Sequence, residues 1–131
     1  MELLSDVSAV QAATHPIKGA HSIWELVLHI AGWDGAVVKR IGGTAIMLSD
    51  AENFPPIKDT SEGAWKKAVE HADHVHAELV NAITTFPDSR LMEQVPGKKE
   101  KYYNYFYMFA GIAQHQCYHA GQIALLKKAK P

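Results

Sequence analysis

The chain has 131 residues, of which 47% are hydrophobic and 21% are charged, a composition typical of a globular domain and not of a disordered chain. Its formal net charge of −1 gives no positive field to attract nucleic acid or anionic lipid, and no apolar run approaches the ~18–20 residues that a membrane-spanning helix needs. We therefore expect a single domain over residues 1–131 that binds neither nucleic acid nor membrane. Because there is one cysteine and no secretion signal, we expect a cytoplasmic protein.

The first third of the chain contains two segments with helical spacing. Before His15-Pro16, a short helix of about three turns is predicted by Leu3, Leu4, Val7 and Val10. Ser22 and Glu25 fit a capping box, so a longer helix is predicted to begin after Ser22 and to end at Gly42-Gly43. Its apolar positions follow three-and-four spacing: Ile23, Leu26, Val27, Ile30, Trp33, Val37 and Ile41. His29 falls on the inward side of this helix.

The middle of the chain predicts a loop followed by a long helix. Asn53–Asp59 contains Pro55-Pro56 and is predicted to be extended. Asp59 or Ser61 then caps a helix that ends before Pro87. The apolar stripe of that helix is Trp65, Ala68, Ala72, Val75, Leu79, Ile83 and Phe86. Three histidines outside or beside the stripe are interpreted as surface or edge residues and not as ligands: His71, His74 and His76.

The last third of the chain predicts a polar loop and a final helix. Asp88–Lys101 is the loop, with a turn at Pro96-Gly97. The helix runs from about Asn104 to Lys128, and its inward seam is predicted to contain Phe106, Phe109, Ile112, Ala113, Gln116, His119, Ile123 and Leu126. Gly111 and Gly121 each cost about 1 kcal/mol in a helix relative to alanine. We therefore expect close helix packing, or room for a ligand, near both glycines, and either interpretation places them near the core.

Three histidines from two predicted helices form a candidate metal site. His115 and His119 are four residues apart and stack on one helix face, about 6 Å apart along the axis. A lone histidine on an apolar face is usually a core residue, but burying two titratable rings side by side is costly unless an ion is shared between them. With His29 as third ligand and a fourth position left to water, we predict an open divalent metal site. Neutral imidazoles suit Zn²⁺, Ni²⁺, Fe²⁺ or Cu²⁺, and the spacing does not choose among these ions.

Three neighbouring residues are candidates for positioning the ligands. Gln122 lies one turn beyond His119 and is expected to orient a ligand or a bound water. Trp33 and Asp34 follow His29 by one turn and are weaker candidates for the same role. No catalytic residue is identified by these patterns.

Two residues between the histidines of the last helix argue against other chemistries. Gln116 occupies the position where the His-Glu-x-x-His motif of metalloproteases has its glutamate base, so peptidase activity is not expected. Cys117 is turned roughly 200° away from His115 on the helix. We interpret Cys117 as a packed thiol and not as a nucleophile or a ligand.

Two stretches that contain these histidines resemble a known family. GAHSIWELVLHIAGW at residues 19–33 and GIAQHQCYHAGQI at residues 111–123 resemble the DinB/YfiT-like superfamily of bacterial four-helix-bundle metalloproteins. The resemblance implies an all-α fold, a DinB-like four-helix bundle, in which one histidine of the second helix and two of the last bind a divalent metal. These positions correspond to His29, His115 and His119. The first helix is shorter here than is usual in the family.

The resemblance also implies a range of functions. Several members are thiol-dependent, among them bacillithiol S-transferases and mycothiol-dependent isomerases, so a metal-dependent thiol S-transferase acting on small electrophiles, with a low-molecular-weight thiol as cosubstrate, is one expectation. A non-catalytic metal-binding or stress-response dimer is the alternative. Because a short first helix leaves apolar surface uncovered, we expect a homodimer.

Overall fold

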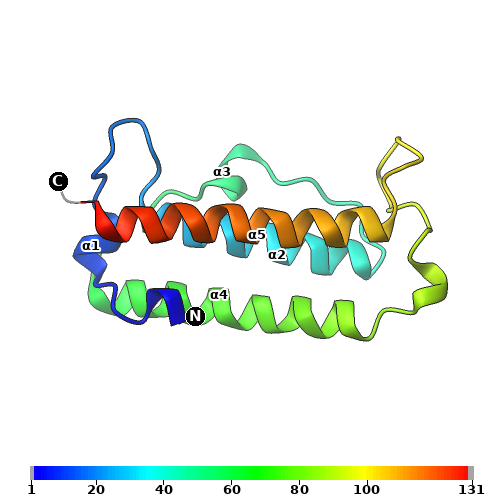
Figure 1. The fold of residues 1–131 in the computed structure, drawn as a ribbon, viewed down its shortest axis with the longest axis horizontal. Helices are drawn as coiled ribbons and strands as arrows, with labels where there is room; N and C mark the ends of the chain where they lie inside the picture. The colour runs from blue at the N-terminus through cyan, green and yellow to red at the C-terminus, as the bar shows by residue number, and fades with distance from the viewer. Residues whose placement is uncertain (1, 130–131) are drawn as a thin grey trace.

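The computed structural model describes residues 2–129 and consists of helices joined by loops (Figure 1). Three long helices make up its body: α2 (Ile23–Ile41), α4 (Glu62–Thr84) and α5 (Tyr105–Lys128). Four short elements accompany them: η1 (Glu2–Leu4), α1 (Ala9–Ala13), α3 (Asp50–Asn53) and η2 (Asp88–Arg90). Over the described residues the only strand-type pairing is an isolated bridge between Gln94 and Asn104. The predicted all-α helical bundle with a short first helix is confirmed.

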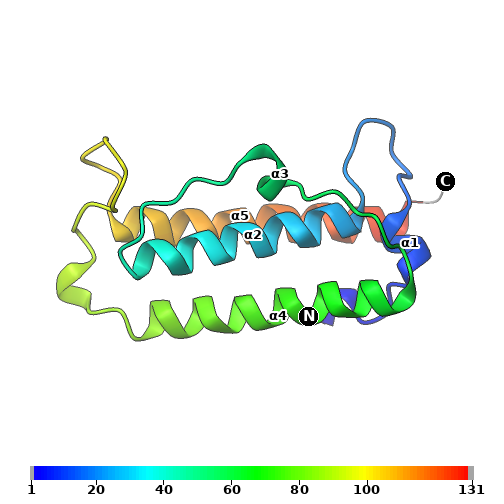
Figure 2. The same ribbon diagram turned by 180° about the vertical axis from the view of Figure 1, so that it is seen from behind.

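Helix α2 is the central element of the bundle. It packs on both other long helices, with α5 beside it in the two opposite views and α4 along its other side (Figures 1 and 2). The predicted capping box fixes its start, because the Ser22 hydroxyl accepts from the Glu25 amide and the Glu25 carboxylate accepts from the Ser22 amide. Ser61 and Asn104 cap α4 and α5 by side-chain oxygens alone, which accept from the backbone amides of Ala64 and Tyr107. The predicted bounds of all three long helices are therefore confirmed to within a residue or two.

Two clusters of buried side chains lie along α2 and hold its neighbours in place. One, around Trp24, Val27 and Trp65, joins α1, α2, α4 and the end of α5. The other, around Val37, Leu79 and Met108, joins the opposite ends of the long helices. Burial of an aliphatic or aromatic side chain of this size contributes about 1.5–3 kcal/mol. Because the two clusters lie on either side of the middle of α2, they fix the part of the bundle in which His29 faces α5.

Four predictions about individual positions on α5 are wrong. The buried face contains Tyr105 and Met108, while Phe106 is 59% exposed and Ala113 is also exposed. Helix α5 has apolar residues around most of its circumference, so their spacing does not identify the buried side. Gly111 and Gly121 are exposed, and a Cβ at either would meet nothing within 4 Å, so neither glycine marks close packing.

The N-terminal segment and the loop after α2 also differ from the prediction. The N-terminal helix is only α1, capped by Ser8, and Val10 on it is exposed. The loop predicted from Asn53 is preceded by the short helix α3, which has its own capping box between Ser49 and Glu52. Helix α3 packs against α2 on the side away from α4 (Figure 2). It thereby places Asn53 beside the first predicted metal ligand. No helix among residues 2–129 is long and apolar enough to cross a membrane.

Candidate metal centre

The three predicted ligands meet in the middle of the bundle, between α2 and α5. His115 Nε2 lies 2.9 Å from His29 Nε2 and 3.1 Å from His119 Nε2, and one ligand atom of each ring lies within 4.8 Å of the others. An ion with Zn–N bonds of about 2.0–2.1 Å in tetrahedral geometry spaces its nitrogens by roughly 3.4 Å. The two distances from His115 are close to this value. His29 and His119 are buried and His115 is partly buried.

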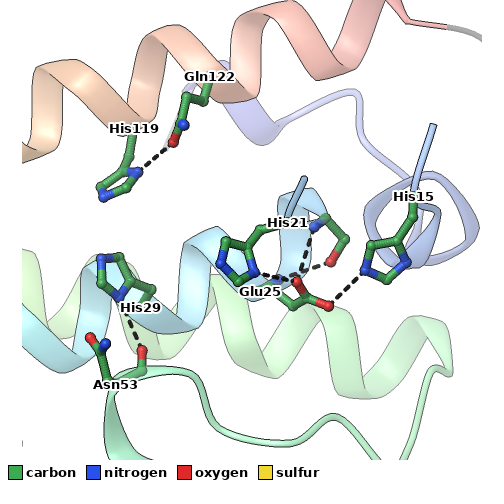
Figure 3. Close-up of polar contacts among 8 residues, drawn as sticks. His15, His21, Glu25, His29, Asn53, His119 and Gln122 are labelled. Atoms are coloured by element: carbon green, nitrogen blue, oxygen red, sulfur yellow. Dashed lines mark hydrogen bonds and ion pairs between the residues drawn. The ribbon is translucent and has the colours of Figure 1, made fainter. Parts of the chain in front are cut away.

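Asn53 holds the His29 ring from the side opposite α5. The Nδ1 atom of His29 donates to the Asn53 backbone carbonyl at 3.0 Å, as Figure 3 shows. The Asn53 side chain is itself held, because Trp33 Nε1 donates to its Oδ1 at 2.8 Å. Trp33 therefore acts on the site through Asn53, which agrees with the prediction that it positions a ligand. The Asn53 contribution itself was not predicted, because a backbone carbonyl carries no signal in the residue type.

Gln122 holds the ring of His119 in the way that the sequence predicts. His119 Nδ1 donates to Gln122 Oε1 at 2.6 Å, one turn along α5 (Figure 3). With Nδ1 carrying the proton in both His29 and His119, the Nε2 lone pairs of these neutral rings are directed towards the shared centre. Such fixing of tautomer and ring orientation is the usual way in which proteins prepare histidines for a metal.

The local electrostatics favour a cation at this centre. Burial, together with the neighbouring imidazoles, lowers the pKa of His115 to about 4, and burial is also the main cause that lowers the pKa of His29. Both rings are thus uncharged at neutral pH. A neutral His115 can donate one proton from Nε2, so it can satisfy only one of the two lone pairs that face it. A divalent ion at the centre would satisfy all three nitrogens, so the residues fit a metal.

Asp34 forms a polar link between the three long helices and does not contact the three candidate metal ligands. Its Oδ1 accepts from Gln116 Nε2 of α5 at 2.8 Å, and His76 Nδ1 of α4 lies 3.5 Å from its Oδ2. Asp34 is buried, and burial is the main cause that raises the pKa of its carboxyl group. The Asp34–Gln116 hydrogen bond fixes the position of α5 relative to α2, and Gln116 is the residue next to His115. Asp34 therefore positions the site through the helices, one step further away than predicted.

A second group of polar residues beside the site was not predicted. Both oxygens of Glu25 are engaged, because His15 Nε2 and His21 Nδ1 each lie 2.8 Å from one of them (Figure 3). The Phe54 ring stacks on His21 with centroids 3.9 Å apart and on His29 with centroids 4.3 Å apart. His21 is therefore one aromatic ring away from the histidine cluster. The i, i+4 spacing of His21 and Glu25 is the sequence signal for this contact, and Glu25 serves both this pair and the capping box.

The remaining candidates lie outside the site. His71 and His74 are exposed and His76 is partly buried, as the pattern of α4 predicts. Cys117 is exposed, so the interpretation of this residue as a packed thiol is wrong. The reason is again that the outward face of α5 is as apolar as its buried face.

A comparison with protein families agrees with this arrangement. The model of a family described as the DinB superfamily matches residues 1–123, which is nearly the whole chain. The chain belongs to the DinB superfamily. No curated protein and no solved structure matches this DinB superfamily chain. Family membership together with the three convergent histidines fits metal binding.

Proposed function

We propose that this DinB superfamily chain binds one divalent metal ion through His29, His115 and His119 and uses it to transfer a low-molecular-weight thiol to a small electrophile. The observation that carries the proposal is the approach of the three rings: His115 Nε2 lies 2.9 Å from His29 Nε2 and 3.1 Å from His119 Nε2, and the rings of His29 and His119 are held from behind. An ion with a free position lowers the pKa of a thiol or water that it binds.

His21 supports a catalytic role because the reaction needs a proton acceptor near the ion. Its Nδ1 is held by Glu25, so its Nε2 is the basic atom of the neutral ring. In the proposed step the thiol proton passes to His21 Nε2 and the sulfur forms a bond to the electrophilic carbon. The leaving group departs with the electrons of the broken bond and takes the proton from His21. The His21–Glu25 pair would supply this base, for which the non-catalytic alternative has no use.

The proposal is tested by measuring metal content and thiol transfer on the same preparations. We expect about one divalent ion per chain in the wild type by elemental analysis and a large loss in His119→Ala. With 1-chloro-2,4-dinitrobenzene as electrophile and bacillithiol, cysteine or glutathione as thiol, His21→Gln should keep the metal and lose about 10²–10⁴-fold in rate. A wild-type protein that holds metal but transfers none of these thiols would favour the non-catalytic alternative. An unchanged metal content in His119→Ala would remove that residue from the ligand set.

We also propose that two copies of the chain associate through the outward face of α5. This face exposes large apolar side chains, including Tyr118 at 65% and Leu125 at 69%, together with Phe106. Monomeric proteins rarely leave a row of such residues in water. Cys117 and Gly121 lie exposed between them, which leaves room for a second helix to approach.

A further inference from the structure

Arg40 is a buried cation without an acidic partner. It lies in the last turn of α2 and is 3% exposed. Its Nε and Nη2 atoms donate to the carbonyl oxygen of Ile46 at 3.2 and 2.9 Å, and across residues 2–129 no carboxylate lies within ion-pair distance of it. A buried charge is costly unless an opposite charge compensates it. The Arg40 guanidinium therefore lacks the anion that such a position normally has.

The same residue lines a cavity that reaches the histidine cluster. The cavity has a volume of about 320 Å³, and both Arg40 of α2 and His115 of α5 are among its lining residues. Trp33 connects them, since its ring lies 5.7 Å from Arg40 Cζ and 6.3 Å from the centroid of the His115 ring. Most of the remaining wall is aromatic or aliphatic, with Met108 and Ile112 as examples. The cavity thus combines one cation, an apolar wall and one of the candidate metal ligands.

The free edge of the guanidinium suits a carboxylate. Arg40 uses the edge formed by Nε and Nη2 for Ile46, and Nη1 makes no hydrogen bond to residues 2–129. The edge that carries Nη1 and the second N–H of Nη2 is therefore available, and two parallel N–H groups of this kind bind a carboxylate in bidentate fashion. A role limited to holding Ile46 would leave this edge without a function.

We propose that this cavity binds an organic carboxylate with an apolar body, with the carboxylate on Arg40 and the other end directed to the histidine cluster. This inference names the substrate class of the proposed thiol transfer and rests on that function only for its biological role, because the binding itself requires no metal. The volume is at the lower end of the range for small-molecule sites. It accommodates a monocyclic or short-chain acid in preference to a large cofactor.

The test compares two probes that differ in charge, with the metal removed so that failure of metal binding cannot affect the result. Isothermal titration calorimetry would measure 4-phenylbutanoate and 4-phenylbutan-1-ol against wild type, Arg40→Gln and Lys39→Gln. Lys39 is the matched control, because it is an exposed cation next to Arg40 on the same helix. We expect the carboxylate to bind at least tenfold more tightly than the alcohol to wild type and to Lys39→Gln, and the preference to disappear in Arg40→Gln.

A second variant keeps the charge and fills the space. Gly111 lines the cavity and a Cβ there meets nothing within 4 Å, so Gly111→Leu should fold and should weaken binding of both probes at least tenfold. Equal binding of the acid and the alcohol to the wild type would overturn the proposal. So would a preference for the acid that survives in Arg40→Gln, or unchanged binding in Gly111→Leu. Metal content, measured separately on wild type, tests the proposed function and is independent of these results.

Discussion

Replacing Gln122 by leucine tests whether the site is prepared for an ion by the hydrogen bonds behind its ligands. The substitution removes the acceptor that lies 2.6 Å from His119 Nδ1 and leaves the three histidines in place. A hydrogen bond of this kind contributes about 1 kcal/mol, and loss of such an outer partner usually weakens metal binding about 10–100-fold. We therefore expect the Zn²⁺ dissociation constant to rise by that factor, which corresponds to about 1.4–2.7 kcal/mol.

A competition titration with a chromophoric chelator would measure this change. Gln114→Leu is the matched control, because Gln114 is on the same helix and is exposed. The helical circular dichroism of both variants should equal that of the wild type, since neither side chain belongs to the buried core. If Gln122→Leu and Gln114→Leu bind Zn²⁺ as tightly as the wild type, the hydrogen bond does not prepare His119 for a metal.

Three further outcomes are expected. The metal-free protein should lose about 1–2 kcal/mol of unfolding free energy between pH 6.5 and pH 4. The reason is that the unfolded chain takes up a proton on His115 near pH 6.5, while the folded ring, with its pKa lowered to about 4, does not. Urea titrations at several pH values would measure this loss, and an unfolding free energy that does not change with pH would contradict it. Gln116→Leu should cost about 1–3 kcal/mol, because it leaves the buried Asp34 without its amide donor, and an unchanged urea midpoint would count against the link between the helices. Size-exclusion chromatography with light scattering should give a dimer that Phe106→Glu converts to a monomer, and a monomeric wild type would contradict the proposed interface.

The parts of the site that depend on helical periodicity could be predicted from the sequence. The four-residue interval between His115 and His119 is sufficient to place two rings on one face. The capping box at Ser22 fixes the register of α2 and so the direction of His29. Gln122 follows from the same geometry, since it is the next position along the face of α5 that carries the histidines.

The parts that depend on tertiary contacts or on the backbone could not be predicted. The Asn53 carbonyl reaches His29 only because α3 packs on α2. The outward, solvent-exposed face of α5 also carries apolar residues. The helical spacing of apolar residues therefore does not distinguish the exposed Phe106 from the buried Met108. Arg40 lies in the last turn of α2, where the helix dipole alone is enough to explain a cation. Its burial against Ile46 and its place in the cavity depend on how the loop after α2 folds back over the helix, which the sequence pattern does not specify.

The most direct test of the account is the Zn²⁺ stoichiometry by isothermal titration calorimetry of the wild type and of His115→Ala, with His71→Ala as control. His71 is exposed on α4 and lies outside the cluster. We predict one ion per chain for the wild type and for His71→Ala, and a dissociation constant at least 100-fold higher in His115→Ala, where two of the three nitrogens remain. Wild-type affinity and stoichiometry in His115→Ala would contradict the claim that the three histidines hold one ion.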